Sequence, residues 1–503
     1  MIIPNVLQIH RTDNVGVALV PLTPGETVEI NGFSFTVREA VPVGHKLALE
    51  EIADGAAIRK YGSTIGNATR PVRQGEWVHS HNLATALHDK LDYRYEPSFH
   101  EFRTVSGAIP TFQGYRRGDG RVGVRNEIWI INTVGCINQQ SERLAELARR
   151  QYQPQIAAGR IDGIYAFSHP YGCSQLGEDL SNTQKLLAGL VRHPNAAGVL
   201  VVGLGCENNQ MADFQKVLGP VDPDRVKFLI LQEVADEMAA GLQLLGELAD
   251  FAGTFQPEPV PVSELTIGLK CGGSDGFSGI TANPLVGAVA DRLIEYGGTA
   301  ILSEVPEMFG AETILMNRAK DQATFKKVVA LINDFKDYFI RNGQEVYENP
   351  SPGNKDGGIT TLEDKSLGCT QKGGTSIVTD VIRYGGRSTV KGLNLLEGPG
   401  NDIVSCTALA AAGAQLILFT TGRGNPMGAI VPTIKVSTNS RLAQGKPHWI
   451  DFNAGRLLEG FTMEGLRDEF FQYLLVVASK ERLTRNEQNG YRDMAIFKSG
   501  VTL

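Results

Sequence analysis

The hydrophobic residues in the N-terminal part of this 503-residue chain occur in short runs separated by turn residues. Many of these runs are rich in β-branched residues, which is typical of small β structure. Asn31-Gly32 predicts a tight hairpin turn between two of them. The predicted strands include residues 17–22, 27–30, 33–38 and 77–81. We therefore expect a β domain over residues 1–90 and a linker over residues 91–113.

From residue 114 onward, apolar runs alternate with amphipathic segments of helical length. The predicted strands are residues 128–134, 161–167, 198–204 and 226–232. The predicted helices between and after them are residues 139–152, 177–191 and 210–217, and a last one that ends near residue 251. Strands that are apolar on both faces and separated by such helices predict a parallel sheet with crossover helices. We expect this α/β domain to cover residues 114–255.

The same alternation resumes after a proline-rich stretch, residues 253–261, which we interpret as a second linker. The predicted strands of this part are residues 265–270, 299–304, 416–421 and 433–437. Its predicted helices are residues 284–296, 321–341 and 466–479, with a loop-rich region before residue 416. A second α/β domain is therefore expected over residues 256–503.

The composition excludes several classes of protein. Hydrophobic residues make up 42% of the chain, which argues against a disordered protein. The net charge of −7 and the absence of a basic stripe argue against nucleic acid as a partner. No apolar run approaches the ~18–20 residues that span a bilayer, so no membrane partner is expected. The N-terminus has no uninterrupted apolar core typical of a signal peptide, and the 6 cysteines are expected to be free thiols in the cytoplasm.

Four cysteines flanked by glycine lie at or just beyond the carboxyl ends of predicted strands, where α/β proteins bind their ligands. They are Cys136, Cys173, Cys206 and Cys271. Thiols in such positions are candidate metal ligands. For any one of these cysteines, the alternative is a purely structural role, in which the glycine forms a turn and the cysteine packs in a small space. Four such cysteines favour one shared functional edge.

Histidines supply the second candidate site. On a strand, His79 and His81 would present both imidazoles on one face, which suits a divalent transition metal or acid–base catalysis. His169 follows a predicted strand, and Lys46 lies on a predicted tight turn. Both are candidates for proton transfer. For each of these four residues, a purely structural or solvated side chain is the alternative.

Several polar residues could bind a carboxylate-bearing substrate, because guanidinium groups and glycine-rich loops recognise anions. The candidates are Arg121, Arg125, Asn126, Ser274, Asp275 and Arg423. Glu304, Glu307 and Glu312 are further candidates. A position at the start of a helix, where carboxylates are favoured, would explain these glutamates equally well. The loop at Cys271 is not a phosphate-binding P-loop, and no dinucleotide fingerprint is complete. A nucleotide cofactor is therefore not expected.

Long segments of the chain resemble the altronate/galactarate dehydratase family. They include GHKLAL at Gly44, the His79-Ser80-His81 segment, TVGCIN, SHPYGCSQLG, GLGCENNQ, CGGSDGFSGITANP, SEVPEMFGAE and TTGRGNP. The resemblance extends over almost the whole chain. It implies an N-terminal β-clip domain of the SAF type followed by an α/β region with mainly parallel sheets. It also implies dehydration of a sugar acid, with D-altronate converted to 2-keto-3-deoxy-D-gluconate, assisted by iron(II) or manganese(II).

This chemistry fits the candidate residues, because a Lewis acid, a base and an acid suffice to remove water. Three alternatives stay open. The substrate could be galactarate or another aldarate or aldonate. Cys136, Cys173, Cys206 or Cys271 could hold an iron–sulfur cluster, although no CxxC pair is present. The protein could also be a non-catalytic sensor of sugar acids. The sequence leaves the oligomeric state open, a homo-oligomer included.

Overall fold

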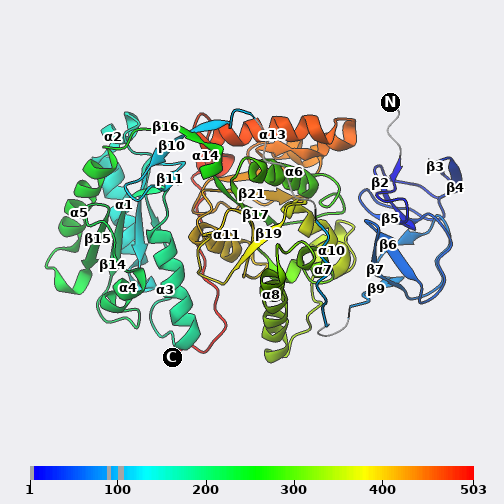
Figure 1. Ribbon diagram of the computed structural model, residues 1–503, viewed down its shortest axis with the longest axis horizontal. Coiled ribbons are helices and arrows are strands. Elements are labelled where there is room, and N and C mark those ends of the chain that lie inside the picture. Colours follow the sequence, from blue (N-terminus) through cyan, green and yellow to red (C-terminus); the bar gives the residue numbers. More distant parts are fainter. Residues whose placement is uncertain (1–4, 88–91, 100–106) are drawn as a thin grey trace.

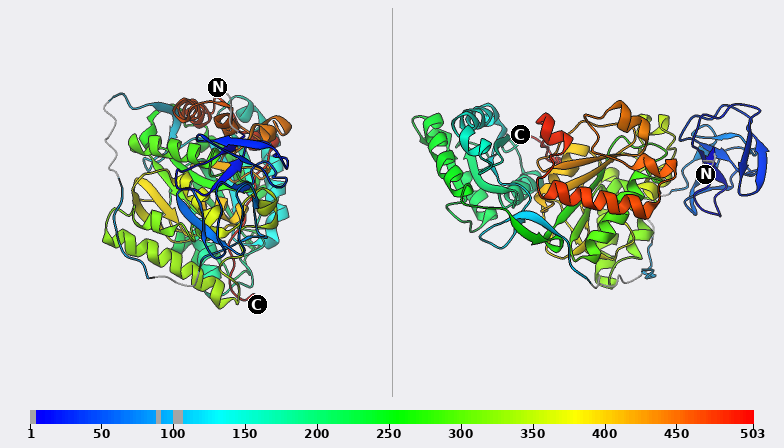
Figure 2. Two further views of the ribbon diagram at one scale, coloured as in Figure 1. Left: turned by 90° about the vertical axis from the view of Figure 1, so that its right-hand side faces the viewer. Right: turned by 90° about the horizontal axis from the view of Figure 1, so that it is seen from above.

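The computed structural model describes residues 5–87, 92–99 and 107–503. Three bodies lie in a row: an N-terminal β region, a seven-stranded sheet with its helices in the middle, and a four-stranded sheet with its helices at the far end (Figures 1 and 2). Antiparallel β structure followed by parallel α/β structure is the predicted fold class, which is thereby confirmed. The predicted linker at residues 91–113 lies partly outside the described residues.

The N-terminal β region consists of short antiparallel strands. They are β1 (Val6–Leu7), β2 (Val15–Ala18), β3 (Thr27–Ile30), β4 (Phe33–Thr36), β5 (Lys46–Ala48), β6 (Ala57–Lys60), β7 (Ser63–Ala68), β8 (Trp77–Val78) and β9 (Leu83–Ala84). They form sheets of order β1-β2-β5-β8 and β6-β7-β9 and the hairpin β3-β4. Asn31 and Gly32 have φ of 49° and 82°, so the predicted hairpin turn is confirmed.

The four-stranded sheet has the order β13-β12-β14-β15, and all its strand pairs are parallel. Its strands are β12 (Glu127–Asn132), β13 (Gly163–Phe167), β14 (Ala196–Gly203) and β15 (Val226–Ile230). Its helices are α1 (Asn138–Gln151), α2 (Gln153–Ala157), α3 (Gly177–Val191), α4 (Met211–Leu218) and α5 (Glu237–Ala252). Every residue of β12 and β14 is buried, which explains the apolar runs within both strands.

The seven-stranded sheet has the order β19-β20-β18-β17-β21-β22-β23 and is also parallel. Its strands are β17 (Thr266–Cys271), β18 (Thr299–Leu302), β19 (Val378–Ile382), β20 (Gly392–Leu396), β21 (Leu416–Thr421), β22 (Thr433–Ser437) and β23 (Phe452–Asn453). The helices of this part are α6 (Ala282–Glu295), α7 (Glu312–Met316), α8 (Gln322–Arg341), α9 (Pro352–Asp356), α10 (Leu362–Cys369), α11 (Asp402–Ala411), α12 (Ser440–Gly445), α13 (Met463–Ala478) and α14 (Arg485–Asn489).

The structure differs from the sequence-based prediction in two segments, one predicted as a linker and one predicted as a strand. Residues 253–261 are not only a linker, because they contain β16 (Glu258–Pro261), which pairs antiparallel with β10 (Thr111–Arg116). β10 also pairs with β11 (Val122–Gly123).

Strand β8 ends at Val78, so no strand carries both His79 and His81. The Asn82 side chain accepts a hydrogen bond from the His79 amide at 2.9 Å and turns the chain there.

The two parallel sheets share a hydrophobic core. Trp129 and Leu187 from the four-stranded part pack in one cluster with Leu409 and Phe419 from the seven-stranded part. Helices α3 and α11 meet at Gly189, where an added Cβ would lie 2.7 Å from the Ala411 carbonyl oxygen. The C-terminal segment returns to α3, as Figure 1 shows. The relative position of the two sheets is therefore fixed by packing and not by a single linker.

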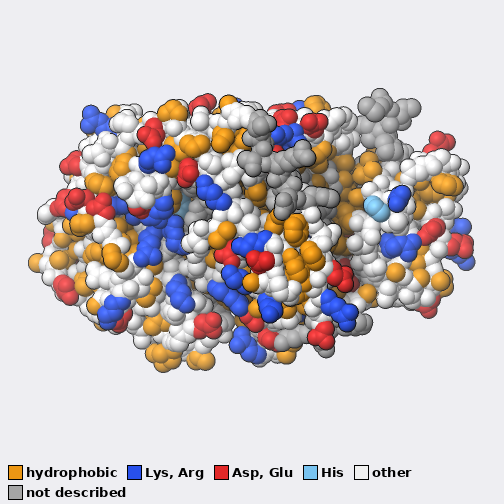
Figure 3. Space-filling view, viewed as in Figure 1, with side chains coloured by type: hydrophobic (Ala, Val, Ile, Leu, Met, Phe, Trp, Pro, Cys, Tyr) orange, Lys and Arg blue, Asp and Glu red, His pale blue; other side chains and the backbone are white. Residues whose placement is uncertain are grey.

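Charged side chains of both signs are interspersed over the face of the molecule shown in Figure 3. This distribution fits the near balance of 48 basic and 55 acidic residues in the sequence. Within the described part of the chain, no helix has the length and apolar character needed to cross a membrane.

Candidate active site

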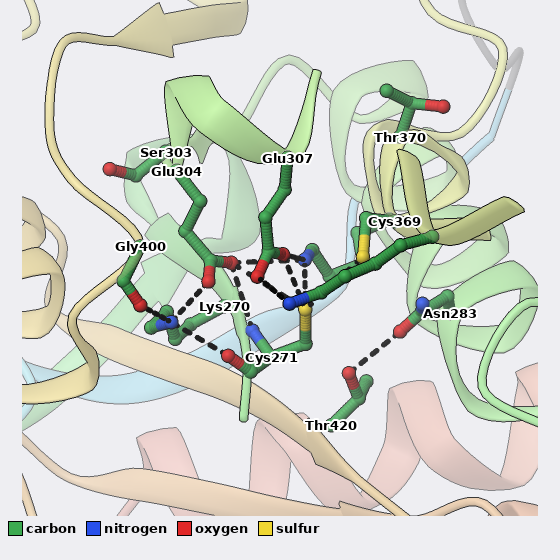
Figure 4. Close-up of polar contacts among 12 residues, drawn as sticks. Lys270, Cys271, Asn283, Ser303, Glu304, Glu307, Cys369, Thr370, Gly400 and Thr420 are labelled. Atoms are coloured by element: carbon green, nitrogen blue, oxygen red, sulfur yellow. Dashed lines mark hydrogen bonds and ion pairs between the residues drawn. The ribbon is translucent and has the colours of Figure 1, made fainter. Parts of the chain in front are cut away.

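A group of ionisable side chains lies buried where β17 and β18 end, next to α10 (Figure 4). We call it the buried polar cluster. Its members are Lys270, Cys271, Glu304, Glu307, Lys365, Cys369 and Lys372. Each of them is at most 7% exposed. Because buried charges are costly unless they are paired, so many of them in one place require mutual neutralisation.

Cys271 lies at the centre of the buried polar cluster. Its Sγ is 2.7 Å from Lys372 Nζ, 3.0 Å from Glu307 Oε2 and 3.6 Å from Cys369 Sγ. The hydrogen bond with Cys271, together with burial, raises the pKa of the Cys369 thiol well above its ordinary value. Cys369 is therefore a thiol at neutral pH as long as only protein groups surround it.

The carboxylates of the buried polar cluster are paired with ammonium groups. Lys372 Nζ lies 3.0 Å from Glu304 Oε2, and Lys365 Nζ lies 2.9 Å from Glu307 Oε1. Lys270 pairs with Glu304 as well. Although burial opposes it, Lys365 and Lys372 hold the pKa of Glu307 below its ordinary value. Burial and the charge of Glu307 raise the pKa of Glu304, so the two neighbouring carboxyl groups differ in their affinity for a proton.

Glu304 also has a strained backbone. Its φ of 70° and ψ of 62° lie in the left-handed region, which is uncommon for a residue with a Cβ. Such a conformation costs about 1–3 kcal/mol and persists where the surroundings impose it. Here the next amide, of Val305, donates to the Gly398 carbonyl at 3.0 Å. The Glu304 side chain points toward Lys270 (Figure 4) and also accepts a hydrogen bond from Lys372 at 3.0 Å.

The buried polar cluster reaches solvent at Asp402, the first residue of α11. The Asp402 side chain is 29% exposed and lies 2.9 Å from Lys270 Nζ. Asn425 Nδ2 donates to Asp402 at 2.6 Å from the other side. Asp402 therefore lies on the more exposed side of Lys270, which is itself buried.

A cleft of about 860 Å³ lies between the seven-stranded part and the N-terminal β region. Two of the predicted substrate-binding residues, Asp275 and Arg423, line it together with Gly44. Arg423 is exposed, and a Cβ on Gly273 would lie 3.8 Å from the Cβ of Arg423. The cleft thus borders the loop that follows Cys271. The third predicted residue of this loop, Ser274, is buried, and its carbonyl accepts a hydrogen bond from Asn354.

Two histidines of the N-terminal β region hold the segment of α9. His79 Nε2 donates to the Lys355 carbonyl at 2.9 Å, and His45 Nε2 donates to the Asp356 carbonyl at 3.1 Å. The two imidazoles stack with their centroids 5.2 Å apart. His81 is exposed and lies against the ring of Trp77. The Nε2 atoms of His45 and His79 are therefore engaged with backbone.

The α9 segment in turn contacts the buried polar cluster. Asn354 Nδ2 donates to the Ser274 carbonyl at 2.9 Å, and Lys365 Nζ donates to Asn354 Oδ1 at 3.3 Å. His79 and His45 are thus connected to Glu307 through α9 and Lys365. This arrangement gives the histidines a way to position the cluster without touching a substrate.

Comparison with known proteins gives the same family for all parts of the chain. Residues 4–86 match the Altronate/galactarate dehydratase SAF domain, residues 114–253 the D-galactarate dehydratase/Altronate hydrolase second domain, and residues 262–502 the D-galactarate/Altronate dehydratase C-terminal domain. The chain is 52% identical to the altronate dehydratase of Escherichia coli and 53% identical to that of Bacillus subtilis, over 99% of each chain. It is 31% identical to the galactarate dehydratase (L-threo-forming) of Escherichia coli, over 98% of this chain and 96% of that protein.

The chain belongs to the altronate/galactarate dehydratase family. The resemblance inferred from the sequence motifs is thereby confirmed, and so is the SAF-type N-terminal region. In this family member, the SAF region and the C-terminal region meet at a buried ion triad. Lys46 Nζ lies 2.8 Å and Lys60 Nζ 3.0 Å from the carboxylate of Asp364, and all three side chains are at most 1% exposed.

Other predicted site residues of this dehydratase-family chain are fixed by backbone or by ion pairs. Lys46 belongs to the Asp364 triad and also donates to the Gly358 carbonyl at 2.7 Å. His169 Nε2 donates to the Asn132 carbonyl at 2.8 Å, and its Nδ1 accepts from the Tyr171 amide. Arg125 is buried and makes a bidentate pair with Glu487. These contacts stabilise the fold.

Two more predicted substrate-binding residues lie far along the chain from the Cys271 loop and are also engaged. Asn126 is buried and donates to the Arg160 and Ala252 carbonyls. Arg121 pairs with Asp119 and donates to the Arg192 carbonyl. The structure therefore brings together Asp275 and Arg423 of the predicted set, but not Arg121, Arg125 or Asn126.

The prediction that four cysteines share one edge is wrong for Cys271. Cys136, Cys173 and Cys206 follow β12, β13 and β14 of the four-stranded sheet and are exposed, whereas Cys271 ends β17 of the other sheet and is buried. The sequence pattern could not separate them, because each is a glycine-flanked cysteine after an apolar strand. Sheet membership depends on strand pairing, which the local sequence does not show.

The buried polar cluster contains a group that could hold a metal ion. Ligand atoms of Cys271, Glu307 and Cys369 all lie within 4.8 Å of one another. Two sulfur donors and one carboxylate suit iron(II) better than manganese(II), which prefers oxygen ligands. Binding would displace Lys372 from Cys271 and require deprotonation of Cys369. His79 and His81 are not part of this group.

The histidine contacts predict a pH-dependent stability. Burial lowers the pKa of His45 from 6.5 to about 4, with His79 and Lys46 adding to the effect. Because the unfolded chain takes up this proton first, stability that is present above pH 6.5 is lost as the pH falls toward 4. The melting temperature of the wild type should therefore fall more steeply over this range than that of His45→Gln. Parallel curves for the two proteins would contradict this assignment.

Sequence reasoning missed Lys270, Lys365, Cys369, Lys372 and Asp402 as parts of the site. Lys372 follows α10 and Asp402 begins α11, far along the chain from Cys271. No local motif distinguishes them from other lysines and aspartates. The only local signal was Cys369, which has the same glycine neighbour as the predicted cysteines.

Proposed function

We propose that this protein is a hydro-lyase that removes water from D-altronate to give 2-keto-3-deoxy-D-gluconate. The proposal rests on one observation: over its whole length the chain is much more similar to two altronate dehydratases than to a galactarate dehydratase. The reaction would take place in the cytoplasm, where free thiols such as Cys271 stay reduced.

Removing water from a sugar acid requires a base and an acid. The base takes the proton from C2, which leaves an enediolate on the carboxylate. The C3–O bond then breaks as the acid protonates the departing hydroxyl, and the resulting enol tautomerises to the keto acid. Carbon is neither oxidised nor reduced overall, so no hydride acceptor is needed.

We propose that Glu304 is the general base that removes the proton from C2 of the substrate. Its raised pKa brings the carboxyl group closer to neutrality, where a general base works best. Lys270 and Lys372, which already contact its carboxylate, would hold the negative charge of the enediolate. Arg423 in the adjoining cleft is a candidate partner for the substrate carboxylate. The strained backbone of Glu304 supports this assignment, since such strain concentrates at functional sites.

A metal ion held by Cys271, Glu307 and Cys369 would supply a Lewis acid for the charge that develops on the substrate. The chain's own contribution there is to keep Glu307 ionised through Lys365 and Lys372. His79 would act by holding α9 in place, as its contact with the Lys355 carbonyl suggests.

Altronate should be converted with a kcat/KM at least about 10²-fold higher than galactarate, because a second carboxylate would have to enter a site built for a hydroxymethyl group. The measurement is keto-acid formation by reduced protein supplied with iron(II). Equal or faster conversion of galactarate would contradict the proposal. Tight binding of altronate without any turnover would instead favour a sugar-acid sensor.

A further inference from the structure

Three exposed thiols lie at the carboxyl edge of the four-stranded sheet, outside the buried polar cluster. Cys136 follows β12, Cys173 follows β13 and Cys206 follows β14, and these three parallel strands are direct neighbours in the order β13-β12-β14. We call these residues the three-thiol edge. Because parallel strands present their carboxyl ends at one edge, the loops that carry the thiols are adjacent in space.

Hydrogen bonds join these loops in every pairwise combination. The Gly135 amide donates to the Tyr171 carbonyl at 2.8 Å, which joins the first loop to the second. The Asn209 amide donates to the Gly172 carbonyl at 2.9 Å, which joins the second to the third. Asn209 Nδ2 donates to the Thr133 carbonyl at 3.0 Å, which joins the third to the first. The three loops therefore form one rigid unit.

A glycine precedes each of the three thiols, and each of these glycines is required by a close approach. A Cβ on Gly135 would overlap the His169 carbonyl, and one on Gly172 would overlap the Thr133 carbonyl. Gly205 has a φ of 125°, and a Cβ there would lie 2.8 Å from Gln232 Oε1. Only glycine permits these contacts, so the sequence Gly-Cys in each loop is what brings the thiols to a common edge.

Glu207 closes the third loop and does not compete with the thiols as a ligand. Its carboxylate accepts hydrogen bonds from Thr133 Oγ1 at 2.6 Å and from the Leu204 and Gly205 amides. Gln232 Nε2 donates to Cys206 Sγ at 3.7 Å. The buried Gln175 has a side-chain Nε2 with no hydrogen-bond partner, two residues after Cys173. The edge thus has a hydrogen-bond donor to sulfur, Gln232, while the Glu207 carboxylate is held by its own loop and by Thr133.

The spacing of the thiols excludes a site at which all three bind one ion. Thiolates that share one tetrahedral ion lie about 4 Å apart, given metal–sulfur bonds of about 2.3 Å. Among the residues that the structure describes, three ligand atoms within 4.8 Å of one another occur only at Cys271, Glu307 and Cys369. The three-thiol edge is therefore wider than a single-ion site. In a cubane iron–sulfur cluster, each thiolate binds a different iron, so the thiolates lie farther apart.

We propose that Cys136, Cys173 and Cys206 bind a cubane iron–sulfur cluster. With three cysteine ligands, one iron keeps an open position on the exposed side of the edge, where it could take an oxygen ligand from a small hydroxy acid or from water. This proposal goes beyond the proposed function and does not depend on which substrate the protein converts.

The test uses the full-length protein, reconstituted without oxygen with iron(II), sulfide and a thiol reductant. The wild type should gain broad visible absorption in the blue, contain iron and acid-labile sulfide in nearly equal amounts, and give a paramagnetic resonance signal after reduction. Cys136→Ser, Cys173→Ser and Cys206→Ser should each lose these signals. Their melting temperatures should change little, because exposed thiols contribute little to folding.

Cys369→Ser and Cys406→Ser are the matched controls, since both thiols are buried and lie outside the three-thiol edge. Both variants should keep the visible absorption and the sulfide of the wild type. The proposal is overturned if the wild type takes up iron without sulfide, or if Cys369→Ser loses the absorption while the three edge variants keep it. If the reconstituted wild type shows the cluster signals but does not convert altronate, the result counts against the proposed function and not against the cluster.

Gln232→Leu supplies a second measurement that does not remove a ligand. Hydrogen bonds to the sulfurs of a cluster raise its reduction potential. Removing the donor to Cys206 Sγ should therefore lower the potential of the reconstituted protein while the iron content stays constant. An unchanged potential would place the cluster away from Cys206 and would contradict the proposal.

Discussion

Glu304→Gln is expected to lower the turnover of altronate by about 10²–10⁴-fold, the usual cost of removing a general base. Glutamine has nearly the same shape and keeps one oxygen that can accept a hydrogen bond from either Lys270 or Lys372, but its amide cannot take the C2 proton. The measurement is kcat at saturating altronate, expressed per folded protein, with the folded fraction determined from the melting curve.

Glu312→Gln is a matched control for this substitution. Glu312 is also buried, and its carboxylate lies 3.1 Å from Lys336 Nζ. It accepts a hydrogen bond from the Tyr93 hydroxyl at 2.6 Å. Neutralising it should reduce stability, as neutralising Glu304 does, but leave turnover per folded protein unchanged. If both variants lost turnover equally, the effect would be structural and Glu304 would not be the base.

Asp364→Asn is expected to lower the free energy of unfolding by about 3–5 kcal/mol, because it leaves two buried lysines without their counter-charge. Lys46 and Lys60 both pair with this one carboxylate, and none of the three side chains is more than 1% exposed. Since the lysines come from the SAF region and Asp364 from α10, the contact between the two regions should weaken first. Thermal and denaturant unfolding measure the effect.

Glu50→Gln is the corresponding control at the surface of the same β region. Its partner Arg59 lies 3.4 Å away, and the two side chains are 59% and 41% exposed. Exposed pairs contribute about 0–1 kcal/mol, so this variant should unfold almost as the wild type does. A comparably small effect of Asp364→Asn would show that the buried lysines release their protons or reach water when the carboxylate is neutralised.

Elements with a strong local pattern could be predicted from the sequence almost to the residue. α3 (Gly177–Val191), β21 (Leu416–Thr421) and β22 (Thr433–Ser437) have exactly the predicted bounds. A fully buried strand needs a continuous apolar run, and an amphipathic helix needs apolar residues at intervals of three or four positions. The burial of each element is therefore visible in its own sequence.

Pairings between distant segments could not be predicted in this way. β16 contains Pro259 and Pro261, which are typical of a linker. It nevertheless pairs with β10, although β10 precedes the four-stranded sheet in the sequence and β16 follows it. Proline is tolerated there because β16 is an edge strand of its small sheet. Whether a short segment forms a strand depended on a partner that its own residues do not specify.

Some features of the candidate site follow from the local sequence, and others depend on contacts between distant segments. The sequence by itself determined the family, the order of the β and α/β parts, and the position of Cys271 after a buried strand, because these follow from local residues and their order. Only the tertiary structure showed that Lys372 and Cys369 meet Cys271 and that Cys136, Cys173 and Cys206 belong to another sheet. Packing and strand pairing decide which distant residues become neighbours, and no local pattern encodes that choice.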